Sequence, residues 1–154
     1  MRIADAAALT TAVADWAIKR DDIRAMALAG SWARGNPRRG SDLDLLLLSD
    51  LAPAYRRSRK WLTGIDFRKA GFRLRSSEGA AYGAVWSLHI HLYPSARVEL
   101  AFAGCAWANT NPIDAGTRSV VMDGFRIMFD RNGMLAKLVE AVPANNRDDQ
   151  ASGR

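Results

Sequence analysis

The chain has 154 residues, of which 49% are hydrophobic and 25% are charged, a balance typical of a globular protein. This length fits one domain, which we expect over residues 1–144, followed by a polar flexible tail over 145–154. No apolar run approaches the ~18 residues that a membrane span needs, which argues against a membrane partner. The start of the chain lacks an apolar export segment, and the single cysteine cannot form an internal disulfide. Together these features predict a cytoplasmic protein.

The net charge is +6, and it is unevenly distributed. The segment from Ala54 to Arg75 carries eight basic residues and one acidic residue, a local charge of +7. Such a block is either a solvated face or an attraction for phosphates, nucleic acid or an acidic partner. It argues against a polycationic substrate.

The first third of the chain predicts a helix, two strands and a loop. Apolar residues recur at a period near 3.6 over Ile3–Lys19, which predicts an amphipathic helix. Ile23–Ala29 is a short apolar run that ends at a glycine and a serine, so we expect a strand. Trp32–Ser41 contains glycines and a proline and should begin as a turn or a short irregular helix and end as a loop. Leu43–Leu48 is continuously apolar, as in a strand packed on both faces.

The middle of the chain predicts a helix followed by strands. Pro53–Leu62 has the composition of a helix with a proline near its start. Phe72–Arg75 predicts a brief strand. Ala81–Tyr93 and Arg97–Phe102 predict longer strands joined at Pro94.

The last third predicts a hairpin and a helix. Asp123 and Gly124 form a strong turn signal between Arg118–Met122 and Phe125–Phe129, which we interpret as two hairpin strands. Met134–Val142 predicts a final short helix. The order of elements predicts an α/β or α+β fold, in which helices pack against a mixed β-sheet.

Two aspartates stand at the mouth of the most apolar run. Asp42 and Asp44 are two apart on a predicted strand, so they share a face at roughly 6 to 7 Å. Two full charges at that distance repel by about 2 to 3 kcal/mol at an effective dielectric near 20. A divalent cation such as Mg²⁺ or Mn²⁺ removes this repulsion and recruits substrate phosphates. The alternative is an exposed strand end with two solvated carboxylates.

Two further features bear on that choice. Gly30 and Ser31 end the preceding strand, where a glycine permits close approach of a phosphate and a hydroxyl can bind it. Glu99 lies in the middle of an apolar strand, where it either faces solvent or joins the two aspartates in a three-carboxylate site.

The combination of these motifs resembles a known family. The pattern reads Leu28-Ala29-Gly30-Ser31, ten residues, Asp42-Leu43-Asp44-Leu45, and later Val98-Glu99-Leu100. It is similar to the nucleotidyltransferase fold of the DNA polymerase beta superfamily, over about residues 23–103. The chain length resembles that of the minimal bacterial nucleotidyltransferase domains, some of which are antitoxins paired with HEPN-type toxins.

The resemblance implies a nucleotidyltransferase that moves a nucleoside monophosphate from a nucleoside triphosphate, with ATP expected, to a hydroxyl acceptor. It implies that Gly30 and Ser31 hold the β- and γ-phosphates. The implied Mg²⁺ or Mn²⁺ ligands are Asp42, Asp44 and Glu99, and Glu99 would also activate the acceptor hydroxyl. Loop arginines would neutralise phosphate charge; they are Arg34, Arg38 and Arg39.

The acceptor stays open among a small molecule, a protein and an RNA. Larger family members carry a further domain for which this chain has no room, so a partner protein or a homodimer would complete the acceptor site. The alternative is a non-catalytic, antitoxin-like or partner-binding module that keeps the fold.

The histidines, the tryptophans and the cysteine also have candidate roles. His89 and His91 lie two apart on one predicted strand, and an even hairpin register would place one of them opposite Glu99. Trp32 follows Ser31 directly and is a candidate wall of the nucleotide pocket, whereas the other tryptophans are expected in the core. Cys105 is expected to be a packed small residue without a partner base.

Overall fold

The structure, a computed structural model, describes residues 1–142. The chain has an α+β fold built on one six-stranded mixed sheet of order β3-β4-β5-β2-β1-β6. The strands are β1 (Ile23–Ala29), β2 (Leu43–Ser49), β3 (Arg73–Tyr82), β4 (Val85–Tyr93), β5 (Ala96–Ala103) and β6 (Phe125–Asp130). The α-helices are α1 (Ile3–Ile18), α2 (Gly30–Arg34), α3 (Ala52–Arg57) and α4 (Ala115–Asp123), with a further helix over residues 134–142. Short 3₁₀ helices are η1 (Lys60–Gly64), η2 (Arg68–Ala70) and η3 (Cys105–Ala108).

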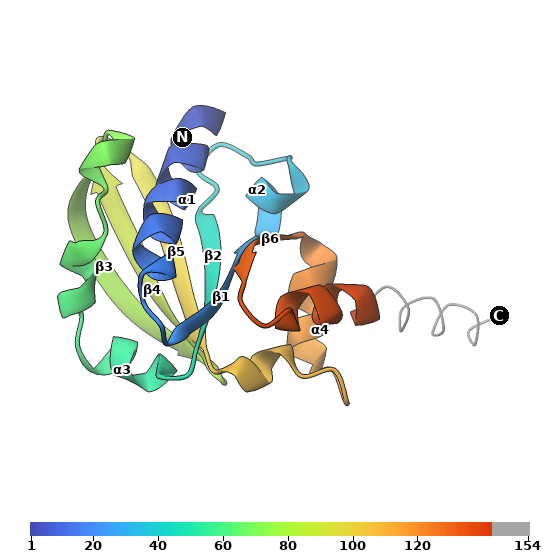
Figure 1. Cartoon of the computed structure of the whole chain (residues 1–154). Coiled ribbons are helices and arrows are strands. Elements are labelled where there is room, and N and C mark those ends of the chain that lie inside the picture. The colour runs from blue at the N-terminus through green and yellow to red at the C-terminus, as the bar shows by residue number, and fades with distance from the viewer. Residues whose placement is uncertain (143–154) are drawn as a thin grey trace.

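The sheet separates two apolar cores, because side chains alternate between the faces of a strand. On β2, Leu45 and Leu47 pack toward α1, α3 and η1 on the first face. Leu46 and Leu48 pack on the second face, against η3 and the helix over residues 134–142. In Figure 1, α1 crosses in front of the sheet, and α4 lies beyond its β6 side. The unbroken leucine run of β2 therefore reflects burial on both faces, as its sequence predicts.

The second face is apolar over β1 and β2 and polar over β3, β4 and β5. Strand β4 turns Trp86, Leu88, Ile90 and Leu92 into the first core. Its alternate residues, which include His89 and His91, therefore lie on the second face, beside the carboxylates of β2 and β5. The covering helices thus leave part of the second face open to a ligand.

Several sequence predictions are confirmed. The α+β class and the mixed sheet agree with expectation. The elements predicted at Ile3–Lys19, Ile23–Ala29, Leu43–Leu48, Arg97–Phe102 and Met134–Val142 are found within one residue or two at each end. Trp32–Ser41 begins inside the short helix α2 and continues without regular structure, as expected.

The predicted hairpin around Asp123 and Gly124 is wrong. Arg118–Met122 is helical, as part of α4, and only Phe125–Phe129 is a strand. Asp114 begins α4 as its N-cap, where its carboxylate accepts hydrogen bonds from the N–H groups of Gly116 and Thr117 at 3.0 and 3.2 Å. Gly124 ends the helix rather than forming a two-residue turn.

Three boundaries also differ from expectation. The strand predicted at Phe72–Arg75 extends as β3 to Tyr82, because it pairs along its length with β4. The strand predicted at Ala81–Tyr93 is interrupted by the β3–β4 turn at Gly83, where φ is +59°. The helix predicted at Pro53–Leu62 divides into α3 and η1 around Ser58, whose backbone is extended.

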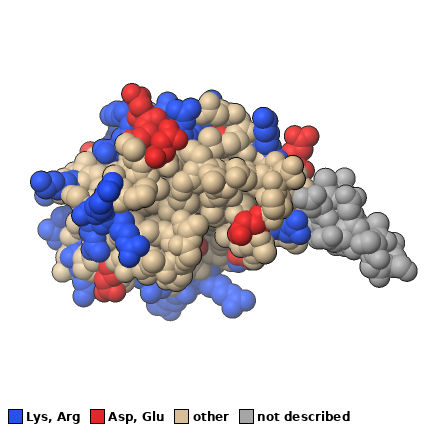
Figure 2. Space-filling view, turned by 90° about the horizontal axis from the view of Figure 1, so that it is seen from below, with Lys and Arg blue, Asp and Glu red and all other residues tan. Residues whose placement is uncertain are grey.

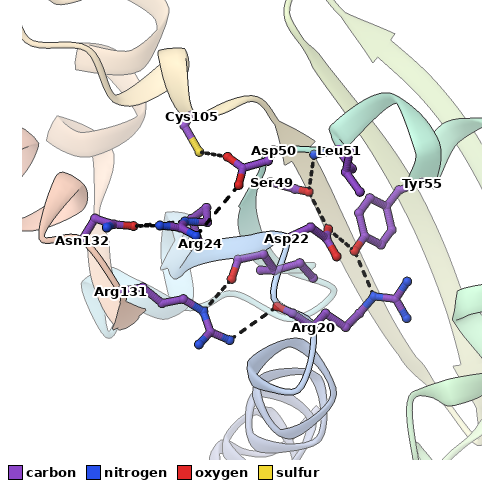
Figure 3. A network of polar contacts seen from close by, with 11 residues as sticks. Arg20, Asp22, Arg24, Ser49, Asp50, Leu51, Tyr55, Cys105, Arg131 and Asn132 are labelled. Carbon is purple, nitrogen blue, oxygen red and sulfur yellow. Dashed lines mark hydrogen bonds and ion pairs between the residues drawn. The ribbon is translucent and has the colours of Figure 1, made fainter.

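A polar network closes the end of the sheet where β1 begins and β2 ends (Figure 3). The Asp22 carboxylate accepts hydrogen bonds from Ser49 Oγ at 2.7 Å and Tyr55 Oη at 2.5 Å. Arg20 Nε donates to the same Tyr55 oxygen at 2.9 Å. Each of these polar groups has a hydrogen-bond partner. The network therefore links the segment after α1 with the end of β2 and with α3.

Helices within residues 1–142 are all too short or too polar to cross a membrane. The predicted polar tail over residues 145–154 lies outside the described part of the chain.

Candidate active site

Asp44 and Glu99 are direct neighbours on the second face of the sheet. Strands β2 and β5 run parallel, and their register pairs Asp44 with Glu99. Burial first, and then the hydrogen bond with Glu99 and its charge, raise the pKa of Asp44 to about 8. The charges of Asp42 and Asp123 act in the same direction. At neutral pH the uncharged form of Asp44 is therefore favoured.

Asp42 lies just before β2 and forms an ion pair with the guanidinium group of Arg97. Its Oδ1 is 2.9 Å from Arg97 Nε in an ion pair, and the Asp42 side chain is 34% exposed. The same Oδ1 is enclosed by protein and has no hydrogen-bond donor of good geometry. Arg97 also donates to the Gly40 carbonyl, so β5 and the loop before β2 fix the position of this guanidinium.

Gly30 brings the backbone against the acidic pair. It follows β1, whose last residue, Ala29, is paired with Asp44. A Cβ at Gly30 would lie 2.6 Å from Asp44 Oδ2, and φ at Gly30 is +70°, so only glycine fits without displacement. The Gly30 N–H donates to the Gly124 carbonyl at 3.1 Å. The absence of a side chain at Gly30 thus lets the backbone lie close to the Asp44 carboxylate. The Gly30 N–H is not available to a ligand, because it donates to Gly124.

The structure places the other predicted phosphate ligands at different distances from the acids. Ser31 occupies the first turn of α2, next to Gly30. Arg34 turns away to Asp123, with Nη1 2.9 Å from Oδ1 and 2.6 Å from the carbonyl oxygen. Arg39 lines a separate basic pocket. Gly30 and Ser31 are therefore beside the acids, and Arg34, at the end of α2, is bound to Asp123 near them, whereas Arg39 lies in the other pocket.

The predicted even register of the β4–β5 hairpin is confirmed. His89 is paired with Glu99, and its Nε2 lies 3.4 Å from Glu99 Oε1. Tyr82 Oη is 3.4 Å from the same histidine nitrogen. A polar chain thus extends from the edge strand to the acidic pair. Trp32, expected at the nucleotide pocket, lines the basic pocket that contains Arg39.

A cavity of about 230 Å³ adjoins the acidic pair. Gly30, Asp44, Glu99 and Asp123 form its polar part. Its apolar wall comes from Val85, Ala101, Trp107 and Val120. This combination of convergent acids and an apolar wall is typical of a small-ligand site.

The donor chemistry of the three acids fits a hard divalent cation. Asp42, Asp44 and Glu99 offer only carboxylate oxygens, the ligands that Mg²⁺ and Mn²⁺ prefer. Asp42 Oδ1 is enclosed and lacks a hydrogen-bond donor of good geometry, but it is in an ion pair with Arg97. As the side chains are placed, however, no group of three or more His, Cys, Asp or Glu residues within 1–142 could hold a metal ion. A cation would have to take the place of Arg97 at Asp42.

Cys105 agrees with its expected packing role. Burial first, and then Asp50, raise the pKa of the Cys105 thiol, and its Sγ lies 3.5 Å from Asp50 Oδ1 at the other end of the sheet. A thiol of raised pKa is a poor nucleophile.

Comparison of the chain with protein-family models and with curated proteins finds no match. What the fold and the site define is therefore a class: an α+β domain with an acidic cluster beside a glycine turn on the open face of its sheet.

Sequence reasoning missed three contributors to this site. Asp123 adds negative charge near Asp44 and binds Arg34, but it was assigned to a hairpin turn. Gly124 packs against Gly30, and a Cβ there would lie 2.8 Å from the Gly30 carbonyl oxygen. Arg97 could have been found from its position two residues before Glu99 on the same strand, because such residues share a face.

Proposed function

We propose that the chain is a nucleotidyltransferase that transfers a nucleoside monophosphate from a nucleoside triphosphate to a hydroxyl acceptor. The observation that supports this most is the pairing of Asp44 with Glu99 beside Gly30, with Asp42 two residues earlier, just before β2. Gathering three acids on a partly buried face is unfavourable unless a cation or a shared proton offsets their repulsion. A site that keeps like charges together despite their repulsion is a candidate catalytic or binding site.

In this proposal Asp42, Asp44 and Glu99 hold Mg²⁺ or Mn²⁺, which supplies charge neutralisation for the triphosphate. The Ser31 hydroxyl donates to a phosphate oxygen, and Gly30 lets the triphosphate approach the acids closely. Glu99 accepts the proton of the acceptor hydroxyl, whose oxygen attacks the α-phosphorus. The bond to the β-phosphate oxygen breaks, and pyrophosphate leaves. His89 contacts Glu99 and orients its carboxylate.

A second candidate function is a non-catalytic partner-binding module. The Asp42–Arg97 ion pair supports it, because this contact removes one carboxylate from the acidic set. The two candidates differ in a simple expectation: only the enzyme needs Asp44 in its carboxylate form.

The test is incubation of the protein with labelled nucleoside triphosphates and Mg²⁺ or Mn²⁺, with and without cell extract. We expect label to be transferred to an acceptor, with release of pyrophosphate. Asp44→Asn should lower the rate about a hundredfold or more, because it weakens both cation and triphosphate binding.

Asp50→Asn is the matched control. Asp50 is an exposed aspartate just after the opposite end of β2, and the substitution makes the same chemical change. It should leave transfer unchanged. Undiminished transfer by a folded Asp44→Asn variant would reject the mechanism, and absence of any transfer by the parent protein would favour the binding module.

A further inference from the structure

A second, larger pocket lies beside the acidic site and is strongly basic. Its volume is about 640 Å³, within the range of ligand-binding sites. Among the described residues that line it, none is Asp or Glu. Its charged lining consists of Arg38, Arg39, Arg75 and Arg97, with His91 beside them. The residues come from the loop before β2 and from three neighbouring strands, so the fold gathers them.

Most of these guanidinium groups are available to a ligand. Arg38 and Arg39 are exposed, and within residues 1–142 no ion pair or hydrogen bond is found for either side chain. Arg75 lies over the Tyr93 ring, with its Cζ 5.5 Å from the ring centroid, which leaves its N–H groups free to turn outward. Several like charges without acids between them repel, and an anion relieves that repulsion.

The basic pocket adjoins a smaller cavity that reaches Asp42, with Arg97 in the lining of both. This cavity of about 400 Å³ shares His91 and Arg97 with the basic pocket and is also lined by Asp42. Its lining includes His89, which contacts Glu99. An anionic ligand in the basic pocket therefore points along the open sheet face toward the carboxylates.

Exposed aromatic rings border the same face. Tyr82 and Tyr93, near opposite ends of the β3–β4 hairpin, are 57% and 46% exposed. The guanidinium groups of Arg73 and Arg75 lie over the Tyr93 ring, and Tyr82 contacts His89. Trp32, half-buried against the first core, forms part of the pocket wall. Rings on which bases stack, combined with arginines that bind phosphates, are the usual elements of a single-strand binding groove.

We propose that the basic pocket binds the phosphate backbone of a single-stranded nucleic acid, which extends across the open sheet face toward the acids. The role of that strand as the hydroxyl acceptor rests on the proposed nucleotidyltransferase function, whereas its binding does not. The pocket is lined by none of Gly30, Ser31, Asp44 and Glu99, so a strand and a nucleoside triphosphate have separate places.

The experiment measures binding of a fluorescein-labelled 12-nucleotide RNA by anisotropy, at low salt and without metal or nucleotide. The double variant Arg38→Glu/Arg39→Glu should bind at least tenfold more weakly. It should also reduce the slope of log K against log salt by about 1.4, since each lost phosphate contact on a single strand contributes about 0.7. Circular dichroism checks its fold, and Arg38→Gln/Arg39→Gln repeats the test with a smaller change of charge.

The matched control is Arg56→Glu/Arg57→Glu, which changes the net charge equally. These exposed arginines lie at the end of α3, near the opposite end of the sheet. Figure 2 looks at the molecule from that end, where blue side chains gather on the side of α3 and β3. The control should change affinity less than threefold. Equal losses in both double variants, or no binding by the parent protein, would overturn the proposal.

Competition identifies the ligand class. Unlabelled RNA should displace the probe, while a glutamate peptide of equal charge and ATP should each require at least tenfold higher concentrations. Equal displacement by the peptide or by ATP would overturn the assignment to a single-stranded nucleic acid.

The Asp44→Asn variant separates this proposal from the proposed function. It should bind RNA like the parent protein while losing nucleotidyl transfer. RNA binding in the pocket without any transfer by the parent protein would reject the enzyme and keep the nucleic-acid site. Transfer without RNA binding would reject the nucleic-acid site and keep the enzyme.

Discussion

The two ends of the β1–β2 pair hold similar residues in opposite electrostatic states. At one end, burial would raise the pKa of Asp22, but hydrogen bonds from Tyr55 and Ser49 outweigh it and lower that pKa below its usual value. At the other end, burial and Glu99 raise the pKa of Asp44 to about 8. Both aspartates lie at a strand end and both are partly buried.

Asp22 and Asp44 differ in the hydrogen-bond donors that surround them. Asp22 faces hydroxyl groups, with Arg20 nearby, so its charged form is stabilised. Asp44 faces another carboxylate, so its charged form is destabilised. The first arrangement stabilises the fold, whereas the second disfavours the charged form of Asp44. Conflict between like charges therefore distinguishes the candidate site from a structural polar cluster.

The largest expected effect comes from Gly124→Ala, at the acidic end. A Cβ there would lie 2.6 Å from Arg34 Cγ and 2.8 Å from the Gly30 carbonyl oxygen, at a φ of +133°. Since backbone atoms cannot move aside easily, we expect a loss of about 3 kcal/mol in the free energy of unfolding, measured by urea denaturation.

Gly133→Ala is the control for Gly124→Ala. Gly133 also has a positive φ, +70°, but nothing lies within 4 Å of its added Cβ. It should lose only about 1 kcal/mol, the usual strain of a left-handed alanine. Equal losses in the two variants would mean that the contact between Gly124 and the Gly30 turn is not tight.

The next effect concerns pH and Asp44. Because its folded-state pKa is raised from 3.8 to about 8, the folded protein binds more protons than the unfolded chain between these values. Stability should therefore be greatest at the acid end of this window and fall as pH rises, by at most about 1.4 kcal/mol per pH unit. Asp44→Asn should remove this slope and be the more stable protein at pH 8.

Urea denaturation in a chelating buffer at several pH values measures this difference. Asp50→Asn, at the other end of β2, should keep the slope of the parent protein. Parallel pH profiles for the parent and Asp44→Asn would show that Asp44 is not the group that loses its proton in this range.

At the network end, Tyr55→Phe should destabilise the protein by about 1 to 2 kcal/mol, because it leaves Asp22 without one hydroxyl donor and Arg20 without its acceptor. The ring, stacked on Phe102 at 4.5 Å, is retained. Since the pKa of Asp22 is lowered, its contribution is present above the unfolded pKa and is lost as pH falls through the folded value.

The gap in stability between Tyr55→Phe and the parent protein should therefore narrow in acid, because the contribution of Asp22 to stability falls as pH falls, whereas that of Asp44 rises. A gap that stays constant below pH 4 would mean that Tyr55 does not act through the charge of Asp22.

Much of this comparison could be predicted from the sequence, because it depends on local pattern. The leucine run of β2 predicts a strand buried on both faces, and the even spacing of Asp42 and Asp44 places them on one face. The β4–β5 register placed Glu99 opposite His89, whereas its pairing with Asp44 depends on the parallel contact of β2 with β5, which the pattern left open. Periodicity thus gives strands, faces and neighbours on one strand.

Contacts between distant segments could not be predicted in this way. The turn signal at Asp123 and Gly124 was misread, because the Asp114 N-cap and the packing of α4 decide that segment's structure. The Asp42–Arg97 pair and the contact of Gly124 with Gly30 depend on tertiary placement. Likewise, Tyr55 meets Asp22 only after α3 packs near the end of β1.

The smallest expected loss of stability, at Gly30, gives the most direct test of the acidic site. Gly30→Ala and Gly35→Ala both place alanine at a positive φ, +70° and +79°, so each should lose about 1 kcal/mol. Only at Gly30 does the added Cβ meet Asp44 Oδ2, at 2.6 Å, whereas nothing lies within 4 Å at Gly35. The flexible carboxylate can move aside, which keeps the stability loss small but displaces an expected cation ligand. In calorimetric titrations with Mg²⁺ and ATP, Gly30→Ala should therefore bind at least tenfold more weakly than Gly35→Ala. Equal binding by the two variants would mean that the glycine turn and the acidic pair act independently.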